Sequence, residues 1–257
     1  MGITRREFLQ IATLAAGVTA ISPSALARNL TPENLFKFKS TGNITILHTT
    51  DTHAQLVPMF YREPDTNIGV GENRGKPPHI TGKEFLGYFG FKPGTLESYA
   101  YTSDDFLNLA KKYGKVGGYT HIASIVKRIR AERDGKVLFI DGGDSLQGSA
   151  TALWSRGEDM VRVMNKMGYD VMTGHWEFTY PEERVLELIR MMNFSFIAQN
   201  VHDATWGDSV FKPYVIKPVN GLTVAIIGQA FPYTPIANPI RFIPNWSFGI
   251  KDDNMQK

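Results

Sequence analysis

Three short polar segments hold the residues whose types could bind metal ions and activate water. Asp51 and His53 follow the apolar run "NITILHTT", Asp144 ends the segment "KVLFIDGGD", and His175 lies in "MTGHWEFT". Divalent cations prefer carboxylate oxygens and imidazole nitrogens, and a shared carboxylate can hold two of them roughly 3.5–4 Å apart. Because the chain has no cysteine, a thiolate zinc site, a disulfide and a cysteine nucleophile are excluded. These residues therefore predict a site for a pair of divalent cations.

Each of these residues also has an ordinary structural interpretation. Asp51 could cap a turn, His53 could be a satisfied loop histidine, and Asp144 could cap the helix that follows it. Taken alone, an Asp-x-His or a Gly-Asp pair is a weak signal. What favours the metal site is that all three segments occur in order and that each follows an apolar run.

The order of the hydrophobic patterns predicts an α/β domain. Short apolar, β-branched runs indicate strands, and apolar residues at i, i+3, i+4 and i+7 indicate amphipathic helices. The expected strands lie within residues 43–50, 136–144, 170–173 and 194–198, and the expected helices run through 122–129, 160–167 and 181–192. A hairpin is expected over 214–228, folded at Asn220-Gly221. In such domains the loops that follow the strands carry the functional site.

The two ends of the chain and one internal segment do not follow this pattern. Arg5-Arg6, an apolar run over 11–21 and Ala25-Leu26-Ala27 predict a twin-arginine signal peptide over 1–27, with a linker over 28–42. A membrane anchor is the alternative, but the apolar run is too short to span a bilayer. Residues 57–115 are rich in glycine, proline and aromatics without a clear period, which suggests a long insertion. Residues 251–257 resemble the first turn of a further helix.

Composition limits the possible partners. The chain has 257 residues, 42% of them hydrophobic and 21% charged, so it can bury the core of one large domain or of one domain with an appendage. A formal net charge of +3 is too small for a nucleic-acid footprint. We therefore expect no nucleic-acid partner. We also expect no stable membrane anchor, because the apolar run is short, and a monomer.

Five segments carry a resemblance to a known family. They read "ILHTTDTHAQL", "GGYTHIASIVKRIR", "VLFIDGGDSLQGS", "MNKMGYDVMTGHWEFT" and "AQNV". Together they resemble the calcineurin-like metallophosphoesterase domain of the 5'-nucleotidase family. The form Gly-His-Trp-Glu-Phe-Thr, the insertion and "GQAFPYTPIANP" are similar to one branch of that family, the SoxB-type thiosulfohydrolases.

The resemblance implies a fold, a cofactor and a reaction. The fold is an α/β sandwich of two sheets flanked by helices over 43–250, with insertion 57–115. The cofactor is a pair of divalent cations, with Mn²⁺ as the first choice. The reaction is hydrolysis of a cysteine-bound S-sulfonate on a SoxYZ-type carrier protein in the periplasm, with release of sulfate.

The resemblance also assigns roles to single residues. Asp51 and His53 match the family's first metal ligands, and Asp144 matches the carboxylate that bridges both metals. His175 stands where the family has the asparagine of Gly-Asn-His-Glu, so it would bind the second metal. Asn200, in "AQNV", matches a position near the site and is a candidate catalytic residue.

Trp176 and Thr179 stand where nucleotidases carry a histidine and an aspartate that assist the reaction at phosphorus. Neither side chain exchanges a proton near pH 7. The loss suits a sulfur leaving group, because a persulfide leaves as a stable anion and an alkoxide does not. We interpret Trp176 as an apolar wall of the catalytic site; simple packing is the alternative.

The family also uses a further downstream histidine and a Gly-His-x-His element. The six histidines of this chain contain no His-x-His pair, and His48, His121 and His202 are expected in the core or at the surface. We therefore expect a chain truncated at its C-terminus, without the family's C-terminal substrate domain. The alternatives to a thiosulfohydrolase are a periplasmic 5'-nucleotidase or cyclic phosphodiesterase and an inactive, truncated metal-binding fragment.

Overall fold

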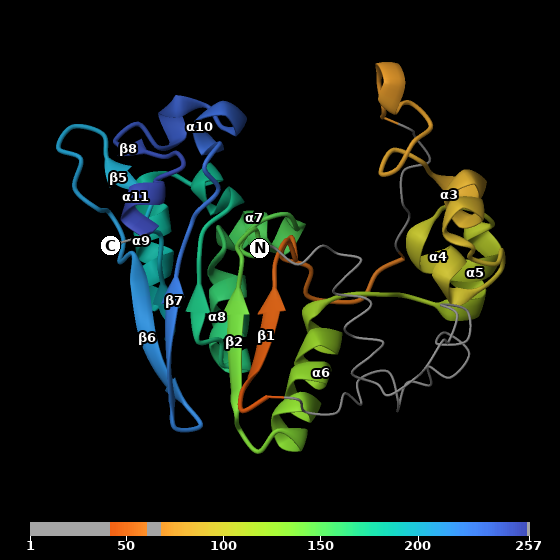
Figure 1. Ribbon diagram of the computed structural model, residues 1–257, viewed down its shortest axis with the longest axis horizontal. Helices are drawn as coiled ribbons and strands as arrows, with labels where there is room; N and C mark the ends of the chain where they lie inside the picture. The colour runs from red at the N-terminus through yellow and green to blue at the C-terminus, as the bar shows by residue number, and fades with distance from the viewer. Residues whose placement is uncertain (1–41, 61–67, 256–257) are drawn as a thin grey trace. The chain divides into compact units, whose positions relative to one another are not determined.

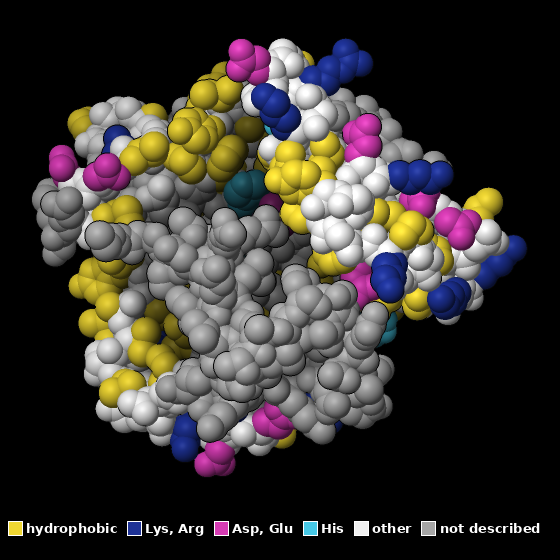
Figure 2. Space-filling view, turned by 45° about the vertical axis from the view of Figure 1, so that its right-hand side comes forward, with side chains coloured by type: hydrophobic (Ala, Val, Ile, Leu, Met, Phe, Trp, Pro, Cys, Tyr) yellow, Lys and Arg dark blue, Asp and Glu magenta, His cyan; other side chains and the backbone are white. Residues whose placement is uncertain are grey.

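The computed structural model describes residues 42–60 and 68–255. The predicted signal peptide and all but the last residue of the predicted linker lie outside this range, so both stay predictions. The chain divides into two compact units, one formed by Gly42–Leu56 with Tyr119–Lys257, and one that contains Val57–Gly118 and with it the predicted insertion. None of the helices in the described part of the chain is long and apolar enough to cross a bilayer. On the face shown in Figure 2, positive and negative side chains are interspersed.

A four-stranded parallel sheet organises the larger unit (Figure 1). Its strands, in spatial order, are β1 (Thr45–Thr49), β2 (Val137–Asp141), β3 (Val171–Met172) and β4 (Ser195–Phe196). The register pairs Thr49 with Asp141 and Asp141 with Met172. Because the strands are parallel and end level with one another, the loops after β1, β2 and β3 leave the same edge of the sheet.

Four helices connect these strands: α6 (Tyr119–Glu132), α7 (Ala150–Ser155), α8 (Glu158–Met167) and α9 (Glu182–Met191). The apolar period predicted α6, α8 and α9, whereas the six-residue α7 is too short to show one. Gly168 ends α8 in the left-handed region at φ 70°, and its N–H donates to the carbonyls of Met164 and Asn165. Such a C-cap satisfies carbonyls that the helix itself leaves free.

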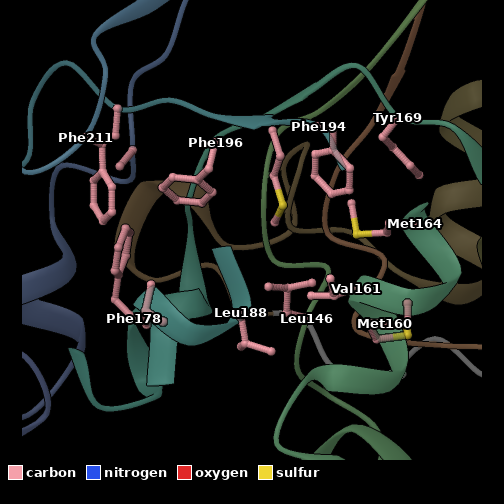
Figure 3. Close-up of a cluster of buried hydrophobic side chains, with 14 of the residues drawn as sticks. Leu146, Met160, Val161, Met164, Tyr169, Phe178, Leu188, Phe194, Phe196 and Phe211 are labelled. Carbon is pink, nitrogen blue, oxygen red and sulfur yellow. The ribbon is translucent and has the colours of Figure 1, made fainter. Parts of the chain in front are cut away.

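The core lies on the face of the sheet that these helices cover (Figure 3). Strand residues Phe139, Met172 and Phe196 contribute to the same buried cluster as Met160 and Met164 of α8. The other helices add Tyr119 and Val126 from α6 and Val185 and Leu188 from α9. This packing fixes the sheet, and so the loops at its edge, to a rigid base.

The predicted hairpin is present as β6 (Tyr214–Val219) and β7 (Leu222–Ile227). Asn220 and Gly221 form its turn with φ of 49° and 74°, the positive values that a two-residue hairpin turn requires. The shorter elements of this unit are β5 (His202–Asp203), α10 (Thr234–Ala237), a 3-10 helix at Ile240–Phe242, β8 (Trp246–Ser247) and α11 (Asp252–Met255). The helical turn predicted over 251–257 is present as α11.

The second unit is more regular than its sequence suggested. It contains a 3-10 helix at Gly71–Asn73, α3 (Gly82–Phe89), α4 (Leu96–Tyr101) and α5 (Phe106–Tyr113). Helices of six to eight residues are too short for a reliable apolar period. They are held by aromatic packing: buried Tyr99 stacks on Phe106 and Tyr113, with ring centroids 6.0 and 5.8 Å away.

Candidate metal centre

The loops that follow β1 and β2 are hydrogen bonded to each other. The N–H of Asp51 donates to the carbonyl of Gly143, and the N–H of His53 donates to the carbonyl of Asp144, both at 2.9 Å. Asp51, His53, Ala54 and Asp144 all have φ between 49° and 58°. Residues other than glycine rarely adopt this conformation, and four of them within two facing loops mark a backbone that the surrounding contacts must hold in place.

Three of the predicted ligands converge at the edge of the sheet. One ligand atom each from Asp51, Asp144 and His175 lie within 4.8 Å of one another. Oδ2 of Asp144 is 3.4 Å from Nδ1 of His175 and 3.7 Å from Nε2 of His53. Both separations are long for a hydrogen bond, but two atoms that each bind a cation at about 2.0–2.2 Å can stand this far apart.

His53 lies at the margin of this group. Its imidazole approaches Asp144, yet it falls outside the set whose ligand atoms are all mutually close. The side chain of His53 is 58% exposed, whereas that of Asp144 is 3% exposed. The structure therefore brings together Asp51, Asp144 and His175 and leaves His53 beside them on the solvent side.

The hydrogen bonding of these side chains fits a cation. Nδ1 of His175 is buried and has no hydrogen-bond partner among the described residues, although buried polar atoms are almost always satisfied. Nε2 of Gln147 donates to Oδ1 of Asp144 at 2.7 Å, and Oδ2, the other oxygen, is the one that faces the two histidines. An ion beside Oδ2 would supply the partner that Nδ1 of His175 lacks.

Two glycines allow the loops to approach this closely. A Cβ atom on Gly143 would lie 2.6 Å from the backbone nitrogen of His175, and one on Gly148 would lie 2.7 Å from the carbonyl oxygen of His53. Both glycines also have positive φ, 94° and 123°. Any larger residue at either position would push the candidate ligands apart.

Glu177, to which the sequence analysis assigned no role, accepts hydrogen bonds from the loops that carry Asp144 and His175. The residue is buried, with 1% of its surface exposed. Oε1 accepts the N–H groups of Ser145 and Leu146 at 2.8 and 3.2 Å. Oε2 accepts those of Asp144 and His175 at 3.0 and 2.8 Å. The signal that could have pointed to it is its position two residues after a candidate ligand, at the acidic end of the Gly-His-Trp-Glu motif.

A second buried carboxyl group, Asp141, lies at the end of β2. Burial raises its pKa to about 7, against the lowering effect of donors from Thr49, Gly143 and Ser145, while the charge of Glu177 adds to the rise. The hydroxyls of Thr49 and Ser145 donate to Oδ2 at 2.6 and 3.1 Å, and the N–H of Gly143 donates to Oδ1 at 2.9 Å. The base of the site is therefore polar and closely hydrogen bonded.

Trp176 and Phe231 flank the ring of His175. Trp176 begins the 3-10 helix η2 (Trp176–Thr179), and its ring centroid is 6.4 Å from that of His175. Phe231, which sequence reasoning missed, comes closer at 4.6 Å, and its N–H donates to the carbonyl of Gly174 at 3.0 Å. The imidazole therefore has two aromatic neighbours. The role of Trp176 as an apolar wall of a catalytic site stays a prediction.

Asn200 is completely buried and its amide is engaged by the backbone. Nδ2 donates to the carbonyls of Ala230 and Gly249 at 2.8 and 2.9 Å, and Oδ1 accepts the N–H of Ala230 at 2.8 Å. With both amide hydrogens used, this geometry favours a role in holding the loop that precedes Phe231. A catalytic role for Asn200 stays a prediction.

Known proteins similar to this chain include proteins named 5'-nucleotidase from bacteria and mammals. The chain is 32% identical to Protein UshA of Salmonella pullorum over 231 residues, which are 89% of this chain and 33% of that protein. It is 31% identical to the 5'-nucleotidase of Vibrio cholerae over 133 residues, 50% of this chain and 24% of that protein. No family model matches the chain.

Among solved structures, the sulfate thiohydrolase SoxB of Thermus thermophilus, in complex with glycerol, matches with a TM-score of 0.75 and 33% identity. The match covers 86% of this chain and 41% of that one. These matches relate the chain to the 5'-nucleotidase family of calcineurin-like phosphoesterases. A 5'-nucleotidase precursor from Thermus thermophilus, at TM-score 0.54 and 22% identity, shares the fold.

The structural match to SoxB confirms the predicted α/β calcineurin-like fold. The similarities also identify the chain as a relative of metal-dependent hydrolases. The chain spans about a quarter to a third of the length of these two curated relatives. The candidate metal centre lies in the loops after β1, β2 and β3, the edge expected for a site in this type of sheet. The assignment of Asp51, His53, Asp144 and His175 as the ligands remains a prediction.

Proposed function

We propose that this protein is a metal-dependent hydrolase that releases sulfate from a cysteine-bound S-sulfonate on a carrier protein. The observation that carries the proposal is the similarity to the SoxB thiohydrolase over 86% of the chain, at 33% identity and a TM-score of 0.75. Trp176 and Thr179 support it, because neither can assist the departure of an alkoxide by proton transfer.

The reaction adds water across the terminal sulfur–sulfur bond. The sulfonate is the terminal group of a cysteine persulfide, R–S–S–SO₃⁻, in which R–S is the cysteine of the carrier. R–S–S–SO₃⁻ and H₂O give R–S–S⁻, HSO₄⁻ and a proton: a bond forms between the water oxygen and the sulfonate sulfur, and the persulfide leaves with the electron pair of the broken bond. The persulfide anion needs no proton from the protein to leave. This explains how the site could work without a general acid at positions 176 and 179.

The residues at the edge of the sheet would divide the work. Asp51, Asp144 and His175 would hold divalent cations, with Mn²⁺ as the first choice and His53 on the solvent side. When bound, such cations supply Lewis-acid stabilisation of the charge on the sulfonate oxygens. Trp176 and Phe231 would offer an apolar surface to a sulfur chain, in keeping with their positions beside the ring of His175.

The proposal extends to the partner and the compartment. The partner would be a SoxYZ-type sulfur carrier protein, and the protein would act in the periplasm as a monomer after export by the twin-arginine pathway. The support is the Arg5-Arg6 motif with its apolar run and Ala-x-Ala ending.

Nucleotide hydrolysis is the second candidate function. Curated relatives at 31% identity carry the name 5'-nucleotidase, and the same cluster of carboxylate and imidazole groups could serve a phosphate ester.

A direct competition of substrates tests the two functions. The protein, loaded with Mn²⁺, is incubated with a peptide that carries a cysteine thiosulfonate and, separately, with AMP; sulfate is measured by ion chromatography and phosphate by a colorimetric assay. We expect sulfate release that Asp144→Asn abolishes, and little phosphate. We also expect Trp176→His, which restores the nucleotidase histidine, to raise the rate on AMP relative to the thiosulfonate. Faster hydrolysis of AMP by the unaltered protein would overturn the proposal, and Mn²⁺ binding without turnover of either substrate would favour a non-catalytic metal-binding protein.

A further inference from the structure

Glu177 connects the loop after β2 to the loop after β3 through a single side chain. Three of its four donors, the amides of Asp144, Ser145 and Leu146, are consecutive in the chain. The fourth donor is the amide of His175, on the other loop. Successive N–H groups that point at one place form a concave anion site, and here the anion is a carboxylate from the protein itself.

The arrangement acts on the candidate ligands directly. Oε2 of Glu177 accepts both the amide of Asp144, at 3.0 Å, and the amide of His175, at 2.8 Å. One oxygen atom therefore sets the separation of the two ligand backbones. The side chains on those backbones place Oδ2 of Asp144 3.4 Å from Nδ1 of His175.

The local backbone needs such a support. Asp144 has φ 58° and Gly143 has φ 94°, conformations that cost free energy unless the surroundings impose them. A buried carboxylate is itself costly unless several hydrogen bonds compensate it. The amides of the strained backbone compensate the buried carboxylate, and the carboxylate in turn holds that backbone in place. Loss of the carboxylate would therefore release both loops.

We propose that Glu177 is a positioning residue: by binding the amides of Asp144 and His175 with one oxygen, it holds these ligands at the separation that a divalent cation requires, without contacting the cation. The inference rests on the proposed function, because it presumes that these residues bind metal. It adds a residue that acts on metal affinity through the backbone of the ligands.

Two substitutions separate the geometry of Glu177 from its charge. In Glu177→Gln one oxygen becomes an NH₂ group, which cannot accept, so two of the four amides lose their partner. Glu177→Asp keeps the charge but is one methylene shorter, so it cannot span both loops. If position is what matters, both variants should bind Mn²⁺ about 10–100-fold more weakly, the range typical of groups that orient metal ligands.

Glu182→Gln is the matched control. Glu182 also joins distant segments through both oxygens, accepting the backbone N–H and the side-chain amide of Asn245 at 2.7 and 2.9 Å. Neither residue belongs to the candidate metal cluster. Loss of this link should leave Mn²⁺ affinity unchanged.

The experiment is calorimetric titration of each protein with Mn²⁺ alone, at a temperature where circular dichroism shows it to be folded. A folded Glu177→Gln with unaltered affinity overturns the inference and leaves the proposed function intact. A Glu177→Asp variant with full affinity also overturns it, because charge would then suffice. If the unaltered protein itself binds no Mn²⁺, the proposed function fails and this inference fails with it.

Amide hydrogen exchange in the unaltered protein tests the same link without a substitution. The amides of Asp144, Ser145 and His175 should exchange as one protected group, because the same carboxylate holds them. Mn²⁺ should slow all three together. Rapid exchange at His175 beside protection at Ser145 would show that the two loops are not joined, even if the variants at position 177 fail to fold.

Discussion

The stability of the metal-free protein should fall as the pH rises through the titration of Asp141. Burial raises the pKa of this carboxyl group from 3.8 to about 7, so the folded protein holds its proton more tightly than the unfolded chain does. The contribution is fully present below about pH 3.8 and is lost as the pH rises through the folded pKa. At 1.36 kcal/mol for each pKa unit, a shift of about three units corresponds to on the order of 4 kcal/mol.

Asp141→Asn is the perturbation that isolates this effect. Asparagine does not titrate, its Oδ1 can still accept the N–H of Gly143, and the hydroxyls of Thr49 and Ser145 can rotate to accept from its NH₂ group. Urea unfolding of both proteins in EDTA, between about pH 4 and about pH 8, gives the free energy of unfolding of each. As the pH rises, the free energy of unfolding of the unaltered protein should fall relative to that of Asp141→Asn by on the order of 4 kcal/mol.

A control of opposite sign sharpens the test. Glu187 is fully exposed, and a hydrogen bond from Arg184 lowers its pKa. Its contribution to stability is therefore present at neutral pH and lost as the pH falls. Glu187→Gln should lower the free energy of unfolding at neutral pH and leave it unchanged at low pH. If the free energies of unfolding of the unaltered protein and of Asp141→Asn differ by the same amount at every pH, the reasoning is refuted. The buried carboxyl group would then titrate as it does in the unfolded chain.

Three further substitutions address the site and the core. Asp144→Asn should abolish Mn²⁺ binding in a calorimetric titration, since the carboxylate lies at the centre of the candidate cluster; retained binding would place the metal elsewhere. Gly143→Ala should cost about 1–3 kcal/mol in urea unfolding and weaken Mn²⁺ binding, because its Cβ would lie 2.6 Å from the backbone nitrogen of His175; an unchanged protein would contradict the close approach of the loops. Met164→Ala should cost about 2–5 kcal/mol, because the side chain is completely buried in the core, and a loss below about 1 kcal/mol would contradict the tight packing of α8.

Much of the larger unit could be predicted from local patterns. The apolar period marks α6, α8 and α9, and the buried run before Asp141 marks β2, because these elements are long enough to repeat their pattern. The turn at Asn220-Gly221 follows from the residue types that positive φ demands. The helices α3, α4 and α5 could not be found in this way, since rings distant in the chain, such as Tyr99 and Tyr113, hold them together.

The candidate site also contains residues that the sequence could predict and residues that only the structure could reveal. Asp51, Asp144 and His175 could be selected from the sequence because each follows a strand, and parallel strands end at one edge of a sheet. Only the tertiary structure revealed what holds them: Glu177 reaches a loop more than thirty residues away, and Phe231 packs on His175 from a loop more than fifty residues further along.

The sequence by itself determined the order of the sheet strands and of the longer helices α6, α8 and α9, the absence of thiol chemistry and the types of ligand available. These properties depend on residue identity and on spacing along the chain. The tertiary structure alone decided which polar side chains face one another, and it assigned Asn200 to the backbone of a loop and Glu177 to the amides beneath the ligands. The physical reason is that a hydrogen bond or a shared cation depends on distances of a few ångströms, and folding sets these distances between residues that the sequence keeps far apart.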